Sequence, residues 1–195
     1  MAQARDSAGR FTSGNGQRAI TWNLPAIPLW VPTEAQAAIL DLEAATVRLA
    51  LQEVAGQVSD EAPVDTGHLA QSFGADPANQ YGGIELLNQT PQEVTGHVFS
   101  TLPYAIVMDQ GRGANKPISR VGIDAIGLWA QRKLGLSADQ AERAKWAIAA
   151  HIIARGIAGT DFVDKGWMSA QPRIQQLFDV LTKQIGEALT RAKRG

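Results

Sequence analysis

Residues 61–73 read EAPVDTGHLAQSF, and this stretch predicts a rigid corner around which the rest of the chain is organised. Pro63 fixes its own φ at about −65° and disfavours the helical conformation at Ala62. A helix that precedes the stretch must therefore end there. We expect one long helix before this corner, and a small sheet with further helices after it.

Three residues within the corner can hold a tight turn. The side chains of Asp65 and Thr66 can accept hydrogen bonds from backbone N–H groups one or two residues on, and Gly67 can adopt a positive φ. Leu69 begins an alternation of larger and smaller side chains up to Phe73, which predicts a short strand. The alternative interpretation is an ordinary turn without a special role.

The segment before the corner predicts a helix from an N-cap at Thr33 to about Ser59. One apolar seam follows steps of three and four residues: Leu40, Ala44, Val47, Leu51, Val54 and Val58. A second apolar stripe lies on another side: Ala38, Ile39, Leu42, Ala45 and Leu49. A helix that is apolar on two sides needs two neighbours. We expect the chain's own sheet to be one, and the other to be its C-terminal helix or another subunit.

Alternating residues after the corner predict a β-hairpin, with strands at 84–90 and 92–100. Pro103 at a first helical position predicts a short helix that Gly111 ends. The Gly-rich loop at 111–117 is expected to be mobile. Three further helices are predicted over residues 119–134, 137–155 and 166–193, with a linker at 156–164.

Residues 1–32 are expected to form an N-terminal arm. Residues 1–20 hold mainly small and polar side chains and predict a flexible tail that orders against a partner or has no role. Residues 21–32 contain three prolines, which disfavour a helix or a central strand. Their apolar side chains predict an extended segment that lies in a groove, on the same chain or on a neighbour: Trp22, Leu24, Ile27, Leu29 and Trp30.

Composition limits the classes of function. The 195 residues carry a net charge of −1, which gives no general electrostatic reason to expect nucleic-acid or membrane binding. Residues 1–115 hold 5 basic and 12 acidic side chains, whereas residues 116–195 hold 13 and 7. This asymmetry suits association between copies of the chain, although solvated surface of either sign is the alternative. There is no cysteine, no apolar run long enough for a bilayer and no apolar signal core. We expect a protein made and kept in the cytosol until it is assembled.

The sequence does not predict a catalytic or metal site. His68, His97 and His151 are isolated from one another and have no partner at a ligand-like spacing. The loop at 111–117 lacks the spacing of a phosphate-binding loop. Its Arg112 and Lys116 could face a DNA backbone, or they could form a solvated loop tip. We therefore expect neither an enzyme nor a bound cofactor.

Two motifs together resemble the tail-component family of long-tailed bacteriophages, which comprises tail-completion and neck proteins. The first motif, APVDTGHL, occupies residues 62–69. The second has Pro103-Tyr104-Ala105 followed by DQGRG at 109–113. The similarity covers about residues 35–190 in the order helix, motif, hairpin, motif, helices. Asp109 stands where the family usually has Glu, and residues 1–32 have no counterpart in the pattern.

The resemblance implies an α+β fold in which a small antiparallel sheet packs against a long N-terminal helix and a C-terminal helix. It implies a single domain at 33–195 with a helical insertion at about 118–157. Structural roles fall on Pro63, Asp65, Thr66, Gly67 and Leu69 at the corner, and on Tyr104, Asp109 and Gly111 at the short helix.

The function implied is structural and without catalysis. Members form a ring, commonly of six copies, at the head–tail junction of the virion, where they complete the tail and join it to the head connector around the DNA channel. The subunit would be made in the cytoplasm of the bacterial host and would contact neighbouring connector, tail-tube or terminator proteins, with no membrane partner. DNA would pass through without sequence-specific binding. The alternatives are a tail-terminator or head-closure ring, or a nucleic-acid-binding protein.

Overall fold

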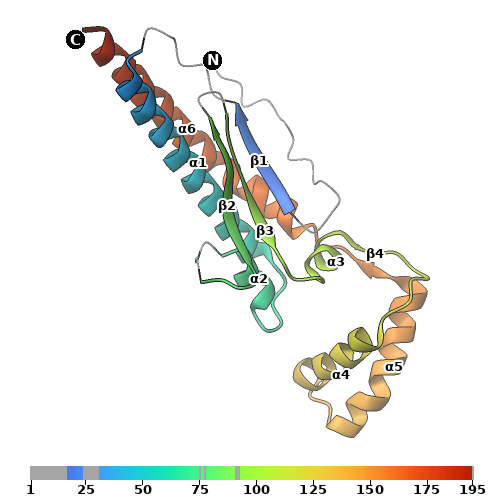
Figure 1. Ribbon diagram of the computed structural model, residues 1–195. Coiled ribbons are helices and arrows are strands. Elements are labelled where there is room, and N and C mark those ends of the chain that lie inside the picture. The colour runs from blue at the N-terminus through green and yellow to red at the C-terminus, as the bar shows by residue number, and fades with distance from the viewer. Residues whose placement is uncertain (1–16, 24–30, 75, 77, 91–92, 195) are drawn as a thin grey trace. The chain divides into compact units, whose positions relative to one another are not determined.

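The computed structural model in Figure 1 describes residues 17–23, 31–74, 76, 78–90 and 93–194. It divides the chain into two compact units. One comprises Met1–Ala105 with Phe162–Gly195, and the other comprises Ile106–Asp161. The expected α+β class is confirmed, with a small antiparallel sheet, a long N-terminal helix and a C-terminal helix.

The first unit contains two long antiparallel helices, α1 (Thr33–Glu61) and α6 (Phe162–Arg194), which lie side by side in Figure 1. They approach closely at Gly166, because a Cβ atom there would lie only 2.6 Å from the backbone of Val58. The apolar seam predicted for α1 is buried from Ala44 to Val58, and Leu40 is half-buried. On α6, Ile174 and Leu181 are buried.

A three-stranded antiparallel sheet completes the first unit, in the order β1 (Gln17–Asn23), β3 (Glu93–Ser100), β2 (Gly82–Thr90). The predicted hairpin is confirmed as β2–β3, with a register shift between Leu86 and Asn88. Helix α1 packs on this sheet where Leu51 meets Gly96 in the central strand. A side chain at residue 96 would collide with Leu51, so the glycine permits the close approach.

The N-terminal arm needs a correction. We expected a flexible tail up to residue 20, but residues 17–23 pair along their whole length with β3, with Trp22 opposite Val94. This strand lies at the edge of the sheet, so the expectation of no central strand over residues 21–32 is not contradicted. The prolines lie beyond this strand, so they do not interrupt its ladder of hydrogen bonds.

The short strand expected at 69–73 is also wrong, because this segment forms α2 (His68–Ser72). The backbone N–H of Gln71 donates to the carbonyl of Gly67 (2.9 Å), and the Ser72 hydroxyl donates to the carbonyl of Leu69 (2.7 Å). The run has no β-branched residue, and an alternation over five positions is too short to separate a strand from one helical turn. The short helix expected after Pro103 is confirmed as α3 (Ala105–Gln110).

The second unit contains the helices α4 (Arg120–Leu134) and α5 (Ala138–Arg155), and the two-residue strands β4 (Gly111–Arg112) and β5 (Ile157–Ala158), which pair antiparallel. The unit begins earlier than the insertion predicted at 118–157. Ser137 and Gln140 form a capping box, in which side-chain oxygen and backbone N–H pair in both directions (3.3 and 2.9 Å). None of the described helices is both long and apolar enough to cross a bilayer.

Candidate functional site

The corner between α1 and α2 has the geometry that its sequence predicts. Ala62 leaves the helical region at φ −67° and ψ 134°, so α1 ends directly before Pro63. Gly67 has φ 83°, the left-handed conformation that favours glycine. Leu69 is buried, whereas Asp65 and Thr66 are exposed. The corner thus anchors one apolar side chain in the core and leaves its acidic tip on the surface.

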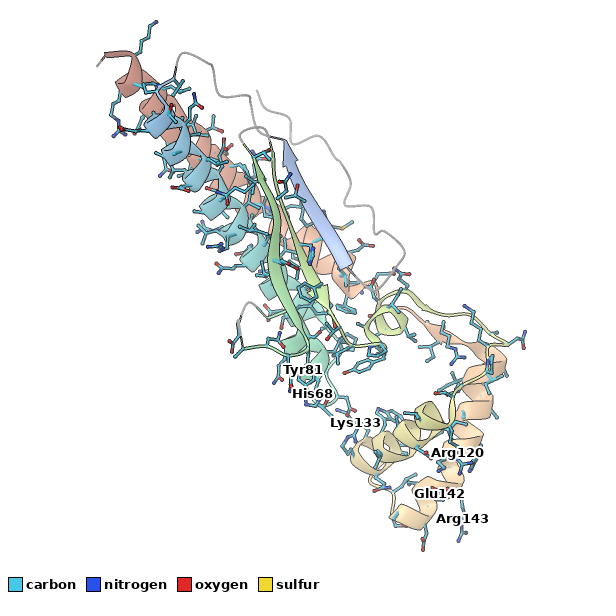
Figure 2. All side chains as sticks on the ribbon, in the orientation of Figure 1. His68, Tyr81, Arg120, Lys133, Glu142 and Arg143 are labelled. Carbon is cyan, nitrogen blue, oxygen red and sulfur yellow. The ribbon has the colours of Figure 1, made fainter. Side chains whose placement is uncertain are left out.

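The structure brings the first motif close to Tyr104 of the second, which lies 39 positions after Asp65 in the sequence. Burial raises the pKa of the Tyr104 phenol, and the nearby Asp65 and Tyr81 raise it further. The ring of His68 stacks on that of Tyr81, with centroids 5.1 Å apart and planes inclined by 23°. Figure 2 labels both residues. Residues from the corner, the turn before β2 and the segment before α3 therefore gather at one end of the first unit.

The remaining motif residues, Asp109 and Gly111, lie at the end of α3 and at the start of β4. Asp109 is buried, and its backbone carbonyl accepts the N–H of Asp161 (2.9 Å). Gly111 has φ 80°, and a Cβ atom there would lie 2.5 Å from backbone atoms of Gly159 and Ile157. The second motif therefore fixes the close crossing of β4 and β5.

The loop at 111–117, expected to be mobile, is hydrogen-bonded at several points. The Arg112 guanidinium donates to the carbonyl of Pro117 (2.6 Å), and the N–H of Asn115 donates to the carbonyl of Ile153 (2.6 Å). Arg112 is half-buried and holds the loop closed, whereas Lys116 is exposed. Of the two residues proposed to face DNA, Lys116 is exposed and Arg112 is half-buried.

The arm residues named for an interface are only partly described. Trp22 lies in β1, and β1 pairs with β3 of the same chain. For this segment, the arm therefore packs on its own chain and not on a neighbour. Leu24, Ile27, Leu29 and Trp30 lie outside the described residues. Val31, which follows them, is 3% exposed.

A buried carboxylate in α1 was missed by the sequence reasoning. Glu43 is 0% exposed, and neither of its oxygens has a hydrogen-bond partner among the residues that the structure describes. Burial raises its pKa from 4.5 to about 7. The sequence could have predicted this burial, because Glu43 lies four residues from both Ile39 and Val47 and so falls on the apolar face of α1.

A buried lysine in the second unit was also missed. Lys145 is 5% exposed and pairs with Asp124 of α4 and Glu142 of α5, at 2.7 Å each. The hydrogen bond from Lys145 lowers the pKa of Asp124, and the same contact raises that of Lys145. The aliphatic stem of Lys145 packs 3.3 Å from the position of a Cβ at Gly127, so the ion pair replaces part of an apolar core.

The three histidines remain separate. His97 is buried on β3 and lies 3.3 Å from Glu85, and burial lowers its pKa more than this carboxylate raises it. His68 and His151 are exposed. Within the described part of the chain, no group of three or more histidines and carboxylates could hold a metal ion.

The second apolar stripe predicted on α1 is largely uncovered. Ile39 is buried and Leu42 is half-buried, but Ala38, Ala45 and Leu49 are exposed. Helix α6 and the sheet therefore cover the seam and leave this stripe to solvent. The sheet and the C-terminal helix, both expected as neighbours of α1, do pack against it.

Comparisons with protein-family models, curated proteins and solved structures gave no match.

Proposed function

We propose that this protein is a structural component of the virion of a tailed phage or phage-like particle. In this proposal it forms a ring at the head–tail junction, completes the tail and joins it to the head connector around the DNA channel. The ring, commonly of six copies, contacts connector and tail-tube or terminator proteins. DNA passes through it without sequence-specific binding.

The observation that carries this proposal is the pairing of the two motifs across the hairpin. The stretch PVDTGHL at 63–69 precedes β2–β3, and Tyr104-Ala105 follows it. Asp65 from the first motif lies close enough to Tyr104 from the second to raise its pKa. The order of elements, long helix, corner, hairpin, short helix and C-terminal helix, is the order that the resemblance implies.

The exposed surface gives a second, independent support. Large apolar side chains are exposed on both units, including Leu49, Leu128, Met168 and Val180, each at least half exposed. A subunit that functions within an assembly would cover such side chains with its neighbours. The unequal charge of the two halves of the chain also suits contacts between copies.

A particle assembled without this protein tests the proposal. The gene is interrupted by a stop codon in the genome that encodes it, and the products are viewed by electron microscopy. We expect DNA-filled heads and separate tails, with joining restored when the protein is supplied from a plasmid. Intact joined particles in the absence of the protein would refute a role at the junction.

The same experiment separates the alternatives. A tail terminator would leave tails of irregular length, and a head-closure protein would leave heads that lose their DNA. A nucleic-acid-binding protein outside the virion would be absent from purified particles. Its binding to DNA would weaken steeply as salt is raised, because phosphate contacts release counterions.

A further inference from the structure

Helix α4 exposes an apolar stripe on the side opposite its buried face. Ile123, Gly127 and Ala130 are buried at steps of four and three residues, and they face α5. Val121, Ala125 and Leu128 follow the same steps on the other side. Val121 is 79% exposed and Leu128 is 56% exposed. Because these side chains are exposed, the stripe has no partner within its unit. This is unusual, since a surface helix normally turns its apolar residues inward.

Helix α1 exposes a comparable stripe in the first unit, formed by Ala38, Ala45 and Leu49. Leu49 is 50% exposed. Ala38 and Ala45, the other two members of the stripe, are small enough for another helix to approach closely. The stripe lies on the side of α1 turned away from the buried seam. Each unit therefore presents one exposed apolar helix face.

The charges around the two stripes are opposite. The exposed charged residues of α4 are Arg120, Asp124, Arg132 and Lys133, and Asp124 is bound to Lys145. Figure 2 labels Arg120 and Lys133, which lie near the two ends of α4. The exposed charged residues of α1 are Glu34, Asp41, Arg48, Asp60 and Glu61. Exposed basic side chains thus outnumber acidic ones along α4, whereas exposed acidic side chains outnumber basic ones along α1, where Arg48 lies beside Leu49.

The whole units show the same difference of sign. Ile106–Asp161 holds 8 basic and 5 acidic residues, whereas the rest of the chain holds 10 basic and 14 acidic residues. Like-charged surfaces would repel each other in a contact between two identical faces. A contact between the two different faces is favoured by both charge and apolar burial.

We propose that the α4 stripe of one copy packs on the α1 stripe of a second copy of this chain. The contact joins two different surfaces, so after each addition the growing assembly keeps an unused α1 stripe at one end and an unused α4 stripe at the other. Such head-to-tail contacts produce a closed ring when the rotation between neighbours closes. The inference rests on the proposed function in taking a second copy as the partner, and it names the surfaces through which the ring forms.

Engineered cysteines test the pairing directly, because the natural chain has no cysteine. Leu49→Cys and Leu128→Cys are made in separate full-length chains, mixed at high concentration and treated with a short thiol-specific cross-linker. We expect a 49–128 cross-link in the mixture, identified by mass spectrometry of the digested product. Val180→Cys, on α6 and 52% exposed, replaces Leu49→Cys as the matched control and should give little product with Leu128→Cys.

Two results would overturn the proposal. One is a mixture in which Leu128→Cys links to Leu49→Cys no better than to Val180→Cys. The other is a chain carrying both substitutions that forms the 49–128 link within itself at high dilution, since the two stripes would then belong to one molecule.

Self-association gives a second readout. Leu128→Asp places a charge in the stripe and should raise the dissociation constant for self-association by at least about tenfold, as loss of a central interface side chain does. Val180→Asp should leave it unchanged, and circular dichroism checks that both variants fold. Raising the salt concentration should weaken association, because exposed charges are screened. Equal affinity of Leu128→Asp and the natural chain in sedimentation equilibrium would contradict the proposal.

These results are separable from the test of the proposed function. A 49–128 cross-link in a protein absent from the head–tail junction would support the contact and refute the location. A protein found at the junction without that cross-link would support the location and refute the contact.

Discussion

Replacing Glu43 by glutamine should change how the stability of the protein depends on pH. Glu43 is completely buried in α1, and its carboxyl oxygens have no hydrogen-bond partner in the described part of the chain. Its pKa is raised from 4.5 to about 7 because burial penalises the charged form. Glutamine keeps nearly the same shape but cannot ionise.

The sign and size follow from this difference in pKa. Between the two values the folded chain binds a proton that the unfolded chain has released, so stability falls as pH rises from about 4.5 to about 7. Each pKa unit corresponds to about 1.4 kcal/mol, so the full penalty is about 3 kcal/mol near pH 8 and under about 1 kcal/mol near pH 5. The free energy of unfolding of Glu43→Gln, relative to that of the natural chain, should therefore be about 2 kcal/mol higher near pH 8 than near pH 5.

Urea denaturation followed by circular dichroism, near pH 5 and near pH 8, measures this gain. Glu34→Gln is the matched control, because Glu34 is exposed on the same helix. Its effect on the free energy of unfolding should be small at both pH values. A difference between Glu43→Gln and the natural chain that is the same at both pH values would refute the reasoning, since it would mean that the pKa of Glu43 is the same in the folded and unfolded states.

Three further predictions concern the fold. Gly111→Ala should lower the free energy of unfolding of the second unit by about 2 kcal/mol or more, because Gly111 has a positive φ and a Cβ atom there would collide with backbone. Gly135→Ala is the control and should cost about 1 kcal/mol, because Gly135 also has a positive φ but lies in open space. Equal costs in thermal unfolding would show that the collision is relieved. Deleting residues 1–23 should lower the melting temperature, because it removes β1 and exposes an edge of β3; an unchanged melting temperature would mean that β1 does not stabilise the sheet. Lys145→Met should lower the melting temperature near pH 7. This decrease should be smaller in acid, because protonation of Asp124 breaks the same ion pair in the natural chain. A decrease of the same size in acid would contradict a stabilising role for the ion pair.

Much of the fold could be predicted because local chemistry and tertiary packing agree. Pro63 ends α1, Ser137 and Gln140 cap α5, and the spacing from Ala44 to Val58 gives the buried seam. Gly67 has the positive φ that its place in the corner suggested. At these positions the information lies within a few residues of the chain.

The errors have different physical causes. The segment at 68–72 is too short for periodicity to separate a strand from a helical turn, and the left-handed Gly67 directs it into α2. The pairing of β1 with β3 depends on residues at least 70 positions apart, which composition does not reveal. The approach of Asp65 to Tyr104 likewise depends on how the hairpin folds back.

The buried charges show a further limit. The residue type of Lys145 predicts an exposed position, because lysine is charged. Its ion pairs with Asp124 and Glu142 nevertheless allow its burial beside Gly127. Glu43 stands on an apolar face that the sequence does define. Its position could have been found by asking which polar residues interrupt the predicted seam.

Cryo-electron microscopy of the particle assembled from the genome that encodes this chain tests the central claim most directly. We predict a closed ring of copies at the head–tail junction, encircling the DNA channel, with α4 of each copy against α1 of the next. A particle whose junction contains no density for this chain, or contains it only as isolated copies that do not touch one another, would contradict the account.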